Sequence, residues 1–247
     1  ESAQHDVYSD LVAGPMSALF DGFNCTILAY GQTGSGKTYS MMGPGADAGA
    51  SPTERARSAG IIPRFGAELF ERVSKVAGAR VSVSYAQLYN EAFLDLLDPG
   101  STAELKLRRS ETKGVHVQGL IEKRVTSAKE LLQLLARAEA GRVTAATRLN
   151  AGSSRSHAIL TLALTVPARK AKEDGTGGSR PGPSKTVTSW ANLVDLAGSE
   201  RYKDAGDTPL RQQESISINQ SLTTLGLVIG TLASAAGGGG SNSGAAH

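Results

Sequence analysis

The chain has 247 residues, of which 40% are hydrophobic and 20% are charged, and its formal net charge at pH 7 is +3. This length suffices for one large domain with a buried core, and so small a positive charge gives no strong signal for nucleic-acid binding. The single cysteine, Cys25, excludes an internal disulfide and fits a reducing compartment. An uninterrupted apolar run of about 18 residues and a signal-peptide pattern are both missing. We therefore expect a soluble intracellular chain that binds neither nucleic acid nor a membrane.

The first predicted elements are a helix and a short strand. Apolar residues recur at helical spacing from His5 to Phe23, around Pro15. A β-prone run, Thr26–Tyr30, follows and leads directly into a Gly-rich segment. The residues after Lys37 are predicted to begin a second helix, whose N-terminus would add positive potential near this segment.

The Gly-rich segment has the pattern G-x-x-x-x-G-K-[ST] of a phosphate-binding loop. Glycines permit the positive φ angles with which consecutive N–H groups surround a phosphate. Lys37 would reach the β- and γ-phosphates, and the Thr38 hydroxyl would bind Mg²⁺. A flexible Gly/Ser turn is the alternative, but a turn would not require Lys37 and Thr38 in that order. The predicted nucleotide-binding residues are Gly31, Gln32, Thr33, Gly34, Ser35, Gly36, Lys37 and Thr38.

The middle of the chain alternates helices with strands. Residues 43–60 are rich in Gly, Ala, Ser and Pro and are predicted to form an exposed loop. A helix is expected after Pro63, with its end at Gly78, and a strand over Val81–Tyr89. Residues 93–97 are predicted to be a short apolar turn.

A small hairpin and a capped helix come next. Residues 105–109 and 115–117 are predicted to pair, and a solvated face is the simplest interpretation of the basic residues Arg108, Arg109 and Lys113. Ser127–Glu130 is a capping box, which predicts a helix that ends at Gly141.

Two strands and one long helix complete the predicted fold. The strands span 158–166 and 187–196, and the segment 168–186 between them is predicted to be disordered at its tip. Apolar residues at spacings of four and three predict an amphipathic helix over about 214–234, followed by a disordered Gly/Ser/Ala-rich tail, 235–247. Strands alternating with helices around a Gly-rich loop predict an α/β fold of three layers, a mainly parallel central sheet with helices on both faces.

Two polar segments adjoin the last two strands. Asn150–His157 directly precedes the first of them, although a Ser/Gly-rich segment is in most proteins only a solvated turn. Asp195 ends the second strand, in the position from which nucleotide-binding sheets hold Mg²⁺, usually through a water. Gly198, three residues later, could offer its N–H to a γ-phosphate.

With these segments, the sequence resembles the kinesin motor domain over nearly its whole length. Ala29–Thr38 is similar to the kinesin phosphate loop, Asn150–His157 to the first switch motif N-x-x-S-S-R-S-H, and Asp195–Glu200 to the second switch motif D-L-A-G-S-E. A P-loop nucleotide triphosphatase fold follows from this resemblance. Further similar segments are Gly60–Arg64, Val83–Glu91, Thr144–Thr147 and Ile218–Leu222.

The resemblance implies a site for ATP and Mg²⁺. Lys37 would contact the β- and γ-phosphates. Thr38 and Ser154 would bind the metal, and Asp195 would hold its water shell.

The resemblance also implies four catalytic residues. Ser153 would touch the γ-phosphate, and Gly198 would sense it through its amide. Arg155 and Glu200 would form an ion pair that closes the two switches and orders the attacking water. For His157, a structural hydrogen bond is favoured over a proton-transfer role.

The helix at 214–234 corresponds to the kinesin helix that lies on the microtubule. Its apolar stripe (Ile218, Leu222, Leu225, Ile229, Leu232) is interpreted as core packing, and its polar side (Gln213, Ser217, Gln220, Ser221, Thr224) would face the filament. Gln220 replaces the Lys that is usual in this family, which leaves one cation fewer for an acidic filament. The implied location is the cytoplasm, on the microtubule cytoskeleton.

The family pattern extends beyond this sequence. An R-x-R-P adenine-binding stretch and a V-P-Y-R-D-S-K-L-T segment have no counterpart here, so we expect a motor core that lacks both ends, with an exposed sheet edge. Any oligomerisation would use other segments. Two hypotheses follow: a microtubule-stimulated ATPase core, or a nucleotide- or microtubule-binding fragment without productive turnover.

Overall fold

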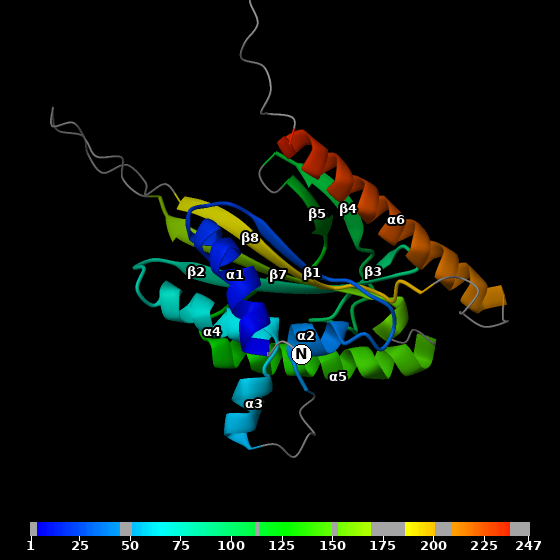
Figure 1. Ribbon diagram of the computed structural model, residues 1–247, viewed down its shortest axis with the longest axis horizontal. Helices are drawn as coiled ribbons and strands as arrows, with labels where there is room; N and C mark the ends of the chain where they lie inside the picture. Colours follow the sequence, from blue (N-terminus) through cyan, green and yellow to red (C-terminus); the bar gives the residue numbers. More distant parts are fainter. Residues whose placement is uncertain are drawn as a thin grey trace, which may run out of the picture.

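A six-stranded mixed β-sheet lies at the centre of the molecule (Figure 1). The structure is a computed structural model and describes residues 4–44, 51–111, 114–149, 153–168, 186–200 and 209–237. Five strands form a continuous path, and a sixth pairs with β2 beside β3. In spatial order they are β1 (Cys25–Ala29), β8 (Thr186–Asp195), β7 (His157–Pro167), β2 (Arg80–Tyr89) and β3 (Ala92–Asp95), with β6 (Lys123–Val125) as the sixth.

Strand direction departs from the prediction. β1 pairs with β8 in parallel, whereas the other pairings described in this sheet are antiparallel. The α/β class is confirmed, but the mainly parallel sheet is wrong. Alternating helices and strands favour parallel crossovers, yet β7 and β8 are consecutive strands that pair as antiparallel neighbours. The single parallel pair sets Ala29 beside Asp195, so the start of the phosphate loop and the second switch motif meet at one edge of the sheet.

One face of the sheet packs against four helices (Figure 1). Side chains alternate across a strand, so every second residue of β2 and β7 turns toward this helical layer. Phe65 and Leu69 of the adjoining helix are fully buried against it, as the predicted apolar face requires. The helices are α1 (Gln4–Phe20), α2 (Lys37–Met42), α4 (Ile61–Val73) and α5 (Ala128–Leu149), and the buried strand residues include Val81, Val83, Tyr85, Leu160, Leu162 and Leu164.

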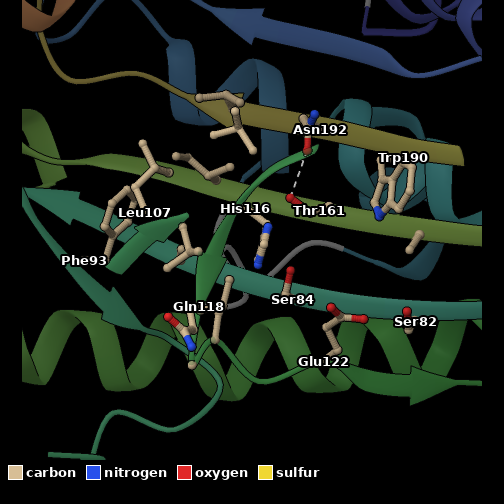
Figure 2. A pocket seen from close by; sticks show the side chains of 18 of the residues that line it. Ser82, Ser84, Phe93, Leu107, His116, Gln118, Glu122, Thr161, Trp190 and Asn192 are labelled. Atoms are coloured by element: carbon tan, nitrogen blue, oxygen red, sulfur yellow. Dashed lines mark hydrogen bonds between the residues drawn. The ribbon is translucent and has the colours of Figure 1, made fainter. Parts of the chain in front are cut away.

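The opposite side of the sheet carries the hairpin of β4 (Lys106–Ser110) and β5 (Gly114–Gln118), together with α6 (Pro209–Gly237) (Figure 1). A cavity of about 630 Å³ lies between the hairpin and the sheet (Figure 2). The sheet side chains that line it include Ser84, Thr161 and Asn192, and Thr161 Oγ1 donates to Asn192 Oδ1 at 2.9 Å. No phosphate-loop residue lines this cavity.

Two segments predicted to be irregular contain regular structure. Within 43–60, α3 (Pro52–Ser58) begins with a capping box in which Ser51 and Glu54 bond to each other's backbone N–H groups. Residues 45–50 of that predicted loop lie outside the described residues. The predicted turn at 93–97 is largely strand β3, which pairs with β2 through a tight turn where Asn90 and Glu91 have φ of 47° and 62°.

The two longest helices extend beyond the ends that were predicted for them. α5 continues through Gly141 to Leu149, because packing of its buried side outweighs the roughly 1 kcal/mol cost of an internal glycine. α6 runs to Gly237, three residues past its predicted end at 234, and the rest of the predicted tail, 238–247, lies outside the described residues, as do residues 169–185. The other predicted elements are confirmed to within a few residues at each end.

The apolar stripe of α6 is only partly packed. Ile218, Leu222 and Leu225 are half-buried, but they do not pack against the hydrophobic core of the described residues as predicted. Ile229 and Leu232 are 48% and 65% exposed, so the prediction of core packing is wrong for the second half of the helix as well. The helix contacts the 3₁₀ turn Ser153–Arg155, and its residues 226–235 are exposed.

Candidate nucleotide and magnesium site

The phosphate loop joins the edge strand β1 to helix α2. Gly36 caps the helix with φ of 92°, a left-handed conformation that favours glycine. The Lys37 ammonium folds over the loop and donates to the Gln32 carbonyl oxygen at 3.0 Å. The Ser199 N–H donates to the Gly31 carbonyl at 3.1 Å, which attaches the second switch motif to the beginning of the loop.

The residues predicted to hold magnesium meet at the carboxyl end of the parallel strand pair. Thr38 Oγ1 donates to Asp195 Oδ2 at 2.5 Å. Burial raises the pKa of the Asp195 carboxyl, while the Thr38 hydrogen bond and the positive charges of Arg142 and Lys37 oppose that rise. Hydroxyl and carboxylate oxygens are the ligands that Mg²⁺ prefers, so the donor set fits this ion. Among the described residues, no group of three or more His, Cys, Asp and Glu side chains is placed to hold a metal ion.

The two switch motifs contact each other and the phosphate loop. The Gly198 N–H donates to the Ser154 carbonyl at 2.7 Å. The Glu200 carboxylate accepts from the Thr33 N–H at 2.9 Å and from Thr33 Oγ1 at 2.5 Å. Desolvation raises the pKa of Glu200, but these two hydrogen bonds, a bond to its own backbone and the charge of Lys37 together hold the pKa below its usual value. A Cβ atom on Gly198 would lie 2.5 Å from Glu200 Oε1 and Thr33 Oγ1, so a larger residue there would displace the Glu200 carboxylate from Thr33.

The structure therefore brings some of the predicted site residues together and leaves the roles of others as predictions. The structure brings together the phosphate loop, Thr38, Asp195, Gly198 and Glu200. Ser154 lies in the 3₁₀ turn and reaches Gly198 through its carbonyl, and Arg155, in the same turn, is partly buried. The side chain of Ser153 lies outside the described residues. The roles of Ser153 and of the Arg155–Glu200 pair stay predictions, and the contact between Glu200 and Thr33 was not predicted from the sequence.

A buried polar cluster beneath Asp195 was also missed. Tyr85 donates its hydroxyl to the Glu139 carboxylate, and the Glu139 carboxylate lies 3.5 Å from Arg142 Nη1. Ser156 Oγ accepts from Arg142 Nη2 at 3.3 Å and from Gln87 Nε2 at 2.7 Å. Burial, followed by the charge of Glu139, raises the pKa of the Tyr85 hydroxyl. A signal was present, because Arg142 continues the spacing of the buried residues Leu131, Leu135 and Ala138 on α5.

Replacing Arg142 by alanine is expected to lower the free energy of unfolding by about 2–4 kcal/mol. The Arg142 side chain is only 6% exposed, and its loss leaves Glu139 without its cation and removes one of the two donors to Ser156 Oγ. Urea denaturation measures the change. Arg137→Ala, at an exposed position of the same helix, is the matched control and should stay within about 0.5 kcal/mol of the wild type. Equal effects of the two substitutions would contradict the assignment.

His157 is buried at the beginning of β7, between the second switch motif and α6. Its Nδ1 accepts from the Ala197 N–H at 3.1 Å, and its Nε2 lies 3.0 Å from Ser221 Oγ. Burial lowers the pKa of the imidazole, and the charge of Glu91 opposes that shift. Both ring nitrogens are occupied by hydrogen bonds within the protein, which agrees with the structural role favoured from the sequence.

Stability is expected to fall as the pH decreases below about 6.5, the ordinary pKa of histidine. Because the folded-state pKa of His157 is depressed, the unfolded chain binds a proton at a higher pH than the folded chain does. The free energy of unfolding therefore decreases between that ordinary pKa and the lower folded-state value. Urea denaturation at pH 7.5 and 5.5 measures this loss, and His157→Gln should show a smaller one. An unchanged loss in the variant would contradict the prediction.

Comparisons with known proteins agree on one family. The kinesin motor domain family matches residues 1–243. This chain belongs to the kinesin motor domain family. Kinesin-like protein KIF13A of Mus musculus is 40% identical over 246 residues, which cover 98% of this chain and 13% of that protein. Kinesin-like protein KIF13B of Homo sapiens is 42% identical over 237 residues, or 94% of this chain and 12% of that protein. The chain thus spans about an eighth of the length of these curated relatives.

Solved kinesin structures share the fold. A fast kinesin, described with its implications for ATPase mechanism and microtubule interactions, superposes with a TM-score of 0.72 at 31% identity, over 87% of this chain and 56% of the other. A KIF14 dimer, solved with AMP-PNP in complex with a microtubule, gives a TM-score of 0.75 at 36% identity, over 98% of this chain and 64% of the other. The P-loop kinesin core predicted from the three motifs is confirmed.

Proposed function

We propose that this kinesin chain is the ATP-hydrolysing core of a microtubule-based motor. The observation that carries the proposal is the meeting of three separate motifs at the end of the β1–β8 pair. Thr38 of the phosphate loop contacts Asp195 at 2.5 Å, Thr33 of the same loop contacts Glu200, and Gly198 contacts Ser154. Phosphoryl transfer depends mainly on positioning and charge stabilisation, which such a convergence supplies.

The loop residues Gly31–Thr38 bind and orient the triphosphate. The N–H groups of the loop would surround the phosphates, and Lys37 would exchange its bond to the Gln32 carbonyl for the β- and γ-phosphate oxygens. Thr38, Ser154 and Asp195 would hold Mg²⁺, which neutralises the charge that develops on the phosphate oxygens. Arg155 and Glu200 close over the nucleotide with Ser153 and orient the attacking water.

Helix α6 is the surface that we assign to the microtubule. The KIF14 relative was solved in complex with a microtubule, and α6 presents exposed polar residues such as Gln220 and Thr224. Ser217 and Ser221, expected on the filament side, instead bond to Glu91 and His157 of the core. Fewer residues of α6 are therefore available to contact a filament than the sequence pattern predicted. We place the protein in the cytoplasm, on the cytoskeleton.

The same helix has the length and composition of a membrane span. Residues Ile216–Ala235 have a mean hydropathy of 1.3, and 6% of the segment is buried. The hydrogen bonds of Ser217 and Ser221 to the core, and the kinesin family membership, favour a protein interface over a bilayer.

Binding measurements test the proposal. A fluorescent ATP analogue titrated into the chain should bind in a Mg²⁺-dependent manner. The chain should also pellet with microtubules, and more strongly with AMP-PNP than with ADP. Loss of either interaction in the folded chain would contradict the proposal. Retention of both interactions without ATP turnover would favour the alternative of a binding fragment.

A further inference from the structure

We infer that His157 is a positioning residue that couples helix α6 to the second switch motif, an inference that rests on the proposed motor function. The imidazole is 7% exposed and lies between two elements that are far apart in the sequence. On one side is the N–H of Ala197, next to Gly198, and on the other is the hydroxyl of Ser221 on α6.

The donor and acceptor of each hydrogen bond are fixed by chemistry. A backbone N–H can only donate, so Nδ1 of His157 must be the unprotonated nitrogen of a neutral ring. The ring proton then lies on Nε2 and is donated to Ser221 Oγ. The Ser221 hydroxyl in turn donates to the Ile218 carbonyl at 2.7 Å. The chain of bonds thus runs in one direction, from the switch segment through the ring into the backbone of α6.

Helix α6 is also attached elsewhere, through contacts with the 3₁₀ turn Ser153–Arg155 and through Ser217. Ser217 Oγ donates to Glu91 Oε1 at 3.2 Å, one turn earlier on the helix and in an exposed position. Glu91 lies in the turn after β2, and its charge also acts on the His157 ring. Of these two hydrogen-bonded attachments, the His157–Ser221 contact leads through the ring to the residue beside Gly198. The chain therefore offers a matched pair of attachments, of which one is connected to the nucleotide site.

Movement of the switch segment would be transmitted through the ring. In this structure the Gly198 N–H is bonded to the Ser154 carbonyl at 2.7 Å, so sensing a γ-phosphate requires that bond to be exchanged. Any shift of Gly198 displaces the adjoining Ala197 N–H, and with it the ring that holds Ser221. By reciprocity, a filament that moves α6 changes the geometry at Gly198. Removing one such hydrogen bond is expected to weaken the coupling between the filament and the nucleotide site by about threefold to tenfold.

Two substitutions of His157 test the hydrogen bonds on the two sides of the ring separately. In His157→Asn the side-chain oxygen can replace Nδ1 as the acceptor for Ala197, but the bond to Ser221 is lost. In His157→Gln the side-chain amide can replace Nε2 as the donor to Ser221, but the acceptor for Ala197 is lost. Ser221→Ala removes the helix side alone, and Ser217→Ala is the matched control on the neighbouring attachment.

The measured quantity is the factor by which microtubules stimulate ATP turnover. Each of His157→Asn, His157→Gln and Ser221→Ala should reduce this factor by about threefold to tenfold, with Ser217→Ala within about twofold of the wild type. The double variant His157→Asn/Ser221→Ala should lose no more than either single variant, because both remove the same bond. Equal losses from Ser217→Ala and Ser221→Ala, or additive losses in the double variant, would overturn the inference.

A second readout does not depend on turnover. Nitrogen-15 NMR of the histidine rings should show His157 as the neutral tautomer protonated on Nε2. Hydrogen exchange of residues 216–225 should change when AMP-PNP is added to the wild type and should stay unchanged in His157→Asn. A wild-type chain that is not stimulated by microtubules would count against the proposed function alone. Protonation on Nδ1, or an equal AMP-PNP response in the variant, would overturn the coupling role.

Discussion

Replacing Lys37 by alanine is expected to raise the dissociation constant of ATP about 100-fold, because a charge-assisted contact with the phosphates is lost. The Lys37 ammonium contacts only the loop carbonyl of Gln32 among the described residues, so its removal should leave the fold intact. Titration of a fluorescent ATP analogue measures the effect, and circular dichroism verifies the fold. Lys75→Ala is the control, since Lys75 forms an exposed pair with Glu71 far along α4. A change below about threefold for Lys37→Ala would contradict its role at the phosphates.

Replacing Glu200 by alanine is expected to have the opposite effect to Lys37→Ala, because it should impair turnover and not ATP binding. ATP binding should stay within a few-fold of the wild type, while turnover falls by about 10²–10³-fold, the range seen when one transition-state contact is removed. The reason is that Glu200 closes the switch motifs over the bound nucleotide and does not itself bind the phosphates. Single-turnover hydrolysis together with nucleotide titration separates the two quantities.

The contact between Glu200 and Thr33 supplies a control for that experiment. Both oxygens of the carboxylate accept hydrogen bonds from Thr33 in this structure. If Glu200 served only to brace the phosphate loop, Thr33→Val, which removes the hydroxyl bond, would reproduce much of the loss in turnover. We expect Thr33→Val to reduce turnover by less than about tenfold, the equivalent of one hydrogen bond. Equal losses of affinity and turnover in Glu200→Ala would contradict the catalytic role.

The parts of the fold that the sequence predicted best are those with local signals. The phosphate loop, the start of α5 after Ser127 and the hairpin of β4 and β5 are each determined by residues close together in the chain. Strand direction is not such a property, because β7 pairs with both β2 and β8 through long connections. Local pattern therefore identified the strands, and only the three-dimensional pairing shows that the sheet is mixed.

The functional site shows the same division between features with a local signal and contacts between distant residues. Motif spacing located Thr38 and Asp195, and the parallel register of β1 and β8 explains why they meet. Arg142 and Ser221 were not assigned to the core contacts that they make. Their partners, Ser156 and His157, lie on other elements, so no local pattern links them. A charged residue within an apolar helical stripe, as at Arg142, was the one available indication.

Phosphate release at saturating ATP, followed as the microtubule concentration is raised, tests the central claim most directly. The rate of the wild-type chain should rise with the microtubule concentration and then saturate. The Glu200→Ala variant, with ATP still bound, should remain near its basal rate throughout. A wild-type rate that stays flat while ATP and microtubules are both shown to bind would contradict the claim that this chain is a motor ATPase core.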